Sequence, residues 1–150
     1  MTLEPTATAL AAERIDSTLL AKLEQNLLLT DAGLDKPDEL VDADIEFHEL
    51  ITMATGNHAL FLACERLGEF LFTAYGTIVE KLGAGLRLLE AHTKIFEAIK
   101  AGDADTAREW MQKNFRDFLR GCELAGIPVD EPIRNVNVAM NITSKRELKS

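Results

Sequence analysis

Residues 41–52, VDADIEFHELIT, are the most informative stretch of the sequence, because they place two polar side chains inside an apolar helical stripe. Val41, Ile45 and Ile51 fall on one face of an α-helix, since they follow its i, i+3, i+4, i+7 spacing. Asp44 and His48 lie one helical turn apart on that same face. A carboxylate and an imidazole that face a core need polar partners, because their unpaired burial is costly. The stretch therefore predicts a packed helix with a polar site on its inner side.

Two later segments repeat this combination of an apolar stripe and an inward polar residue. His92 precedes Ile95 and Ile99 by three and seven residues, which is the spacing of one helical face. Asn114 follows Met111 by three residues in the last helical segment. We therefore expect three helices to direct polar side chains toward the interior.

Start and stop signals divide most of the chain into helices. Asp16, Asn57 and Asp103 are good N-cap residues, and glycines follow the ends of most segments. Glu4 in the opening turn favours the helix dipole. Gly68 and Gly76 weaken the longest segment, so a kink or break is expected there. The expected helices cover about residues 4–15, 16–33, 37–56, 58–82, 86–100 and 104–125, which predicts an all-α fold.

The predicted second helix has a leucine-rich face that should pack on the core. Its members are Leu19, Leu20, Leu23, Leu27 and Leu28. Beyond Pro132 the pattern changes, because apolar residues from Val136 to Ile142 alternate with mostly polar ones, as in a short edge strand or a loose tail. The expected organisation is one helical domain over residues 1–130 and a C-terminal tail over residues 131–150.

Composition excludes several classes of protein. The chain has 150 residues and a formal charge of −9, and such an acidic chain should not bind DNA by itself. No apolar run reaches the length of a membrane span, and the N-terminus does not resemble a secretion signal. Cys64 and Cys122 form no C-x-x-C motif and are expected to be reduced. These features predict a cytoplasmic protein without a membrane partner.

Asp44, His48 and His92 form a candidate metal site, since one oxygen and two imidazole donors suit a divalent ion. The simpler alternative is a core histidine that is hydrogen-bonded to Asp44. A further alternative is a small helical metalloenzyme with a two-histidine, one-carboxylate site. No motif of a nucleophilic enzyme, nucleotide-binding loop or zinc protease occurs. His58 directly follows the cap Asn57, so it is expected at the surface and not as a ligand.

Two further residues are candidates for binding a small molecule. Arg66 lies on the apolar fourth segment, where its guanidinium could bind a carboxylate through two hydrogen bonds. The alternative is a solvated arginine beside Glu65 or Glu69. Tyr75 is the second candidate, and a core aromatic is its simpler interpretation.

The order of several motifs resembles the FadR-type C-terminal ligand-binding (FCD) domain of GntR-superfamily transcription regulators. The resemblance runs from about Leu3 to Gly126. The motifs that carry it are Leu3-Glu-Pro with Leu10-Ala-Ala-Glu-Arg14, Asp44-Ile-Glu-Phe-His48, Ala54-Thr-Gly-Asn57 with Leu60, His92-Thr-Lys-Ile-Phe-Glu-Ala-Ile99 with Gly102-Asp103, and Ala107 with Met111.

This resemblance implies an antiparallel bundle of about six or seven helices that binds a small effector, often a carboxylic acid, over a divalent metal such as zinc or nickel. The family's metal motif falls on Asp44, His48 and His92. A further histidine is expected three residues after Met111, and this sequence has Asn114 there. A neutral amide is a poorer ligand than imidazole for such ions, so Asn114 is expected to hydrogen-bond either the effector or a metal-bound water instead.

The resemblance also implies partners and a role. Domains of this kind help to form homodimers, and a winged helix-turn-helix domain normally precedes them. That domain would lie before Met1 and is expected to be absent from this chain. The implied role is effector sensing that controls DNA binding by a regulator, without catalysis.

Overall fold

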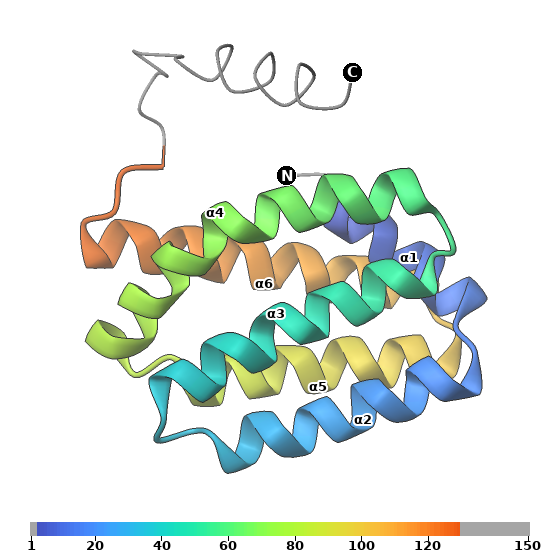
Figure 1. Cartoon of the computed structure of the whole chain (residues 1–150), viewed down its shortest axis with the longest axis horizontal. Coiled ribbons are helices and arrows are strands. Elements are labelled where there is room, and N and C mark those ends of the chain that lie inside the picture. Colours follow the sequence, from blue (N-terminus) through green and yellow to red (C-terminus); the bar gives the residue numbers. More distant parts are fainter. Residues whose placement is uncertain (1–2, 130–150) are drawn as a thin grey trace, which may run out of the picture.

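The computed structural model describes residues 3–129, with the side chains of all of them except 66–67 and 69–73. This part of the chain folds into six helices and no strand, and from α2 onward consecutive helices run antiparallel (Figure 1). The predicted all-α antiparallel bundle is therefore confirmed. The helices are α1 (Leu3–Arg14), α2 (Ser17–Ala32), α3 (Pro37–Ala54), α4 (His58–Leu82), α5 (Gly85–Ala101) and α6 (Ala104–Ala125).

Local sequence signals explain where these helices begin and end. The side chains of Asp16, Asn57 and Asp103 each accept a hydrogen bond from the backbone N–H three residues later, at 2.8, 3.1 and 3.1 Å. These bonds satisfy N–H groups that have no partner inside the helix. Pro37 opens α3, where a missing N–H costs nothing. Gly102 ends α5 with φ +70°, a conformation that glycine adopts without steric cost.

Among the described side chains, the core consists of two apolar clusters that both include residues of α3. The larger cluster joins α1, α2, α3, α5 and α6 and contains the almost completely buried Phe47, Ile51 and Met111. The smaller cluster contains Leu40, Val41, Tyr75, Val79 and Leu88. Asp44 lies on α3 between Val41 of the smaller cluster and Phe47 of the larger one. The fold thus places a carboxylate at the junction of two apolar regions.

The predicted apolar face of α2 was wrong at Leu28, whose exposed fraction is 61%. The face that packs on the bundle contains Leu23, Asn26 and Thr30, at i, i+3 and i+7. Asn26 is buried because its amide donates to the carbonyl of Ala43 at 3.0 Å. Leu19, Leu20 and Leu27 are partly buried against the same core, so the rest of the predicted leucine face is confirmed.

The expected break in α4 does not occur, since the helix runs from His58 to Leu82 through both Gly68 and Gly76. It does bend toward its C-terminal end (Figure 1). A single glycine costs a helix only about 1 kcal/mol relative to alanine, and packing against α3 and α6 offsets this cost. The predicted tail, residues 131–150, with its alternating segment from Val136, lies outside the described residues.

Candidate functional site

Asp44 and His48 project from α3 on the side that faces α1, α5 and α6. They are one helical turn apart, and Oδ1 of Asp44 lies 3.6 Å from Nε2 of His48. Both side chains are mostly buried, with exposed fractions of 19% and 18%. The inner stripe of α3 therefore carries the pair of polar side chains that the sequence predicts.

His92 on α5 contacts the same carboxylate oxygen as His48. Its Nε2 lies 3.2 Å from Oδ1 of Asp44, and the residue is completely buried. The imidazole stacks on Phe47, with ring centroids 3.8 Å apart and planes inclined by 9°. Neither ring nitrogen has a hydrogen bond of acceptable geometry within the described residues. Buried nitrogens of this kind are rare, so the site calls for a further partner.

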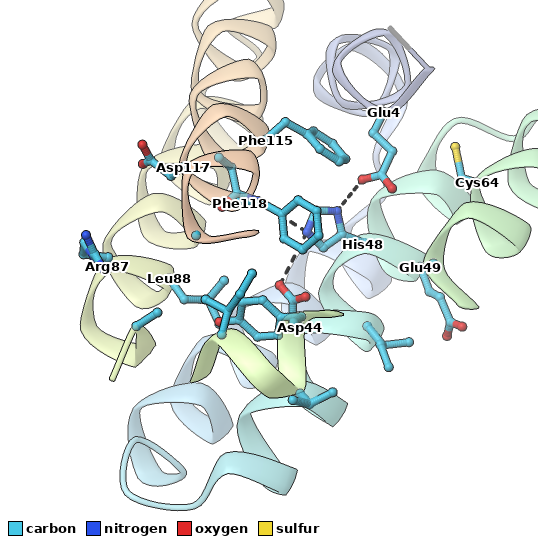
Figure 2. Close-up of a pocket in the computed structure, with 18 of the residues that line it drawn as sticks. Glu4, Asp44, His48, Glu49, Cys64, Arg87, Leu88, Phe115, Asp117 and Phe118 are labelled. Carbon is cyan, nitrogen blue, oxygen red and sulfur yellow. Dashed lines mark hydrogen bonds and ion pairs between the residues drawn. The ribbon is translucent and has the colours of Figure 1, made fainter. Parts of the chain in front are cut away.

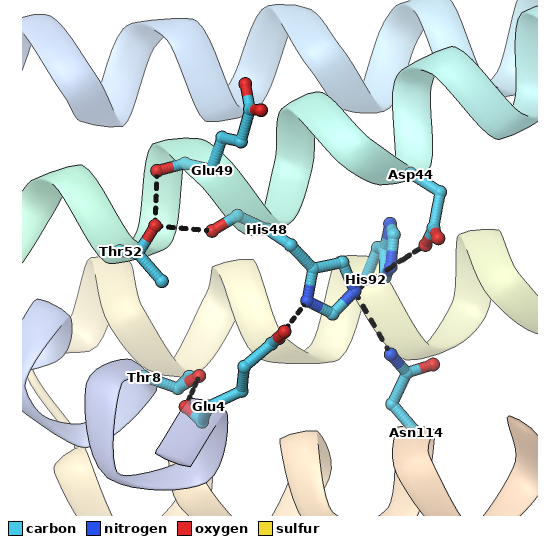
Figure 3. Close-up of polar contacts among 8 residues, drawn as sticks. All are labelled: Glu4, Thr8, Asp44, His48, Glu49, Thr52, His92 and Asn114. Carbon is cyan, nitrogen blue, oxygen red and sulfur yellow. Dashed lines mark hydrogen bonds and ion pairs between the residues drawn. The ribbon is translucent and has the colours of Figure 1, made fainter. Parts of the chain in front are cut away.

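Glu4 on α1 completes the cluster (Figure 3), and its role was not recognised in the sequence. Its carboxylate contacts Nδ1 of His48, and its side chain is only 6% exposed. This contact keeps a proton on Nδ1 and leaves Nε2 directed toward Asp44. Glu4 shares a buried helical face with Ala7, Thr8 and Ala11, at i+3, i+4 and i+7. That spacing was the signal in the sequence that Glu4 faces inward.

Asn114 on α6 borders the cluster on its remaining side. Its Nδ2 lies 3.5 Å from Nε2 of His48, at the outer limit of a hydrogen bond (Figure 3). Asn114 occupies the position where the family resemblance implies a further histidine. Its side chain faces His48, in agreement with the inward direction that its helical spacing predicts. An amide at this position can donate to an acceptor in the site.

Neighbouring charges set the ionisation of these groups. For Asp44, burial favours the neutral acid, but the adjacent His48 and His92 more than offset this and hold its pKa well below the usual range. For His48, burial favours the neutral ring, but the charges of Glu4 and then Asp44 raise its pKa well above the usual value. Burial lowers the pKa of His92. The cluster therefore contains a carboxylate, an imidazolium and a neutral imidazole near pH 7.

The donor atoms fit a divalent ion of the zinc or nickel kind. One oxygen of Asp44 and one nitrogen each of His48 and His92 all lie within 4.8 Å of one another. Imidazole and carboxylate are suitable ligands for such ions, and one of the two unpartnered nitrogens of His92 would gain a partner. An ion would displace the proton on Nε2 of His48, whereas Glu4 would still hold the ring through Nδ1. When bound, the ion would supply positive charge and free coordination positions for an anionic ligand.

The cluster opens into a pocket of about 450 Å³ (Figure 2). Asp44, His48 and Asn114 line its wall, whereas His92 is not a lining residue and lies behind Asp44. Tyr75 also lines the pocket, and its buried hydroxyl has no hydrogen-bond partner among the side chains that the structure describes. Apolar lining residues are Val41, Ile45, Ile78, Leu88, Phe115 and Phe118. The pocket therefore has a polar wall and a largely apolar remainder.

The remaining candidates from the sequence lie in different places. Arg66 is on α4, but its side chain is not among those that the structure describes. His58 is exposed and stacks on Phe61, away from the cluster, as predicted. Two arginines that were not considered, Arg87 and Arg120, line the pocket with exposed side chains. They could meet a ligand only near the solvent.

The comparison with protein families identifies the domain. A model of the FCD domain matches residues 1–117. The chain belongs to the FCD domain family. FCD domains are the effector-binding C-terminal domains of GntR-family transcription regulators, and this family is not enzymatic. The resemblance seen in the sequence is confirmed, and the family does not support the metalloenzyme alternative.

A solved structure gives a second, independent comparison. The chain is similar to E. coli McbR/YncC, with a TM-score of 0.66 and 25% sequence identity. The match covers 79% of this chain and 59% of that one, so this chain spans less than two thirds of the length of its structural relative. No curated protein matches the chain. Within residues 3–129, none of the helices of this chain has the length and apolarity needed to cross a membrane.

Proposed function

We propose that this FCD domain senses a small carboxylic acid, which binds in the pocket over a divalent ion held by Asp44, His48 and His92. The observation that carries the proposal is the position of Oδ1 of Asp44, 3.2 Å from His92 and 3.6 Å from His48, at the wall of the pocket. In the cytoplasm, the acid would shift the conformation of a homodimeric regulator and so control its binding to DNA.

The charges around the pocket explain why an acid would need the ion. Its described lining residues include more acids than bases, so a carboxylate would be repelled by an ion-free pocket. A divalent ion beside Asp44 offsets part of this negative charge. The acidic lining residues are Glu4, Asp44, Glu49, Glu65 and Asp117, and the basic ones are Arg87, Arg120 and the protonated His48.

Three residues are proposed to contact the effector directly. The amide of Asn114 and the hydroxyl of Tyr75 can each donate a hydrogen bond into the pocket. Burial, and then the charge of Asp44, raise the pKa of Tyr75, so its hydroxyl keeps the proton that it would donate. Arg66 is retained as the third contact because a guanidinium suits a carboxylate.

A thermal-shift screen of small carboxylic acids tests this function. We expect some acids to raise the Tm when zinc or nickel is present, because a ligand that binds only the folded state stabilises it. The same acids should have no effect with a chelator or in His92→Ala. A Tm shift that persists with the chelator would show that the acid binds without the ion. The absence of any Tm shift over the whole series would contradict acid sensing.

A further inference from the structure

The pocket is much larger than the smallest carboxylic acids require. Its volume of about 450 Å³ equals that of roughly 15 water molecules at ~30 Å³ each. Acetate has only four non-hydrogen atoms and would leave most of this space to water. Pockets of about 300–1,000 Å³ generally bind molecules of drug-like size. The volume therefore favours an effector with a substantial body beyond its carboxylate.

The walls of the pocket indicate what that body is made of. Away from Asp44 and His48, the pocket is bounded by α4, the start of α5 and the second half of α6. Ile78 and Leu88 on this side are almost completely buried, and Phe118 is partly buried. Side chains of this kind favour a hydrocarbon ligand over a polar one, because the transfer of apolar surface from water to an apolar environment is favourable. Figure 2 labels Leu88 and Phe118 among the residues that line the pocket together with Asp44 and His48.

Two glycines keep this space open. No described atom lies within 4 Å of a Cβ added at Gly68, which lines the pocket from α4. A Cβ added at Gly121 on α6 would lie 3.0 Å from Ile78. Larger residues at these positions would therefore fill the pocket or displace its apolar wall.

On the basis of the proposed acid-sensing function, we propose that the effector is a monocarboxylic acid with an apolar chain of about six to ten carbon atoms. Its carboxylate lies at the polar wall of Asp44 and His48, within reach of Asn114. Its chain lies against Ile78, Leu88 and Phe118. Among the side chains that the structure describes, no buried base lines the far end of the pocket to pair with a second carboxylate, because Arg87 and Arg120 are exposed.

A chain-length series tests this inference on the zinc-loaded protein. Calorimetric titration with acetate, butanoate, hexanoate, octanoate and decanoate should show a Kd that falls by up to about fourfold per added methylene until the pocket is full. Octanedioate should bind more weakly than octanoate, because its second carboxylate would be buried among apolar side chains. Octylamine should bind more weakly still to the zinc-loaded protein.

Two substitutions locate the chain within the pocket. Gly68→Leu should weaken octanoate binding at least about tenfold and leave acetate and zinc binding unchanged, since the added side chain occupies the apolar space. Gly76→Ala on the same helix is the control, because Gly76 does not line the pocket. Ile78→Ala should shift the optimum to a longer acid. If Gly68→Leu does not fold, the response of Ile78→Ala still decides.

The possible outcomes separate this inference from the function on which it rests. If acetate and octanoate bind equally well, acid sensing stands and the apolar chain is wrong. If octanedioate or octylamine binds more tightly than octanoate, the ligand class is wrong. If no acid of any length binds the zinc-loaded protein, the proposed function itself fails.

Discussion

The carboxylate of Glu4, in the first turn of α1, is paired with Nδ1 of His48, which follows 44 residues later on α3. The other ring nitrogen of His48 faces Asp44. One imidazole thus connects the first helix of the domain to the candidate metal site. A ligating histidine whose second nitrogen donates to a carboxylate has a fixed orientation and a more basic ligating nitrogen.

Glu4→Gln should therefore weaken zinc binding although Glu4 is not a proposed ligand. We expect a loss of about 10–100-fold in affinity, as is usual when the partner of a metal-bound histidine is removed. Glu13→Gln is the matched control, because Glu13 lies on the same helix but is exposed. Equal zinc affinity in Glu4→Gln and the parent, measured by competition with a chromogenic chelator, would show that this contact does not support the site.

Substitution of leucine by alanine should lower the stability strongly on one face of α2 and hardly at all on the other. Leu23 is completely buried and Leu28 is 61% exposed. Leu23→Ala should lower the free energy of unfolding by about 2–5 kcal/mol, because it leaves a cavity. Leu28→Ala should change it by less than about 0.5 kcal/mol. Urea denaturation of both variants measures this difference, and similar losses would mean that α2 packs on another face.

Cys64 is a buried free thiol at the pocket wall, and its reactivity should depend steeply on pH. Burial, and then the charge of Glu4, raise its pKa to about 11. Only the thiolate reacts, so at pH 8 about one thiol in a thousand is reactive, compared with about one in four for an ordinary cysteine. Iodoacetamide labelling of Cys64 should speed up about tenfold per pH unit between pH 8 and 10.

Mass spectrometry of the labelled peptides checks this prediction, with protein unfolded in urea as the control for an ordinary thiol. Labelling of Cys64 at pH 8 should be about 250-fold slower in the folded protein than in the unfolded one. Comparable rates in both states would contradict the buried position of this thiol.

The helices could be predicted because their signals are local. Side-chain periodicity and caps such as Asp16 and Asn57 act within a few residues of one another. The inward direction of His92 and Asn114 followed from the same periodicity. The exposure of Leu28 could not be predicted, because it depends on which neighbouring helices cover α2. The pairing of Glu4 with His48 joins residues far apart in the chain, and only the packing of α1 against α3 creates it.

Asn114→His should raise the affinity for divalent ions, because it adds an imidazole next to His48. Neutral imidazole is a better donor to zinc or nickel than an amide, and changes even in outer partners alter affinity about 10–100-fold. Nickel titration calorimetry should therefore show binding at least about tenfold tighter than in the parent. Asn114→His combined with His92→Ala controls for a site that the new histidine forms alone. Unchanged affinity in the single variant would mean that residue 114 does not reach the ion.

Asp44, His48 and His92 are proposed to hold a divalent ion together. The most direct test is calorimetric zinc titration of tag-free protein, of His48→Ala and His92→Ala, and of His58→Ala as the control for an exposed histidine. We expect the parent and His58→Ala to bind zinc with the same affinity and the other two variants to lose this binding. Zinc binding that survives His92→Ala, or that disappears equally in His58→Ala, would contradict this proposal.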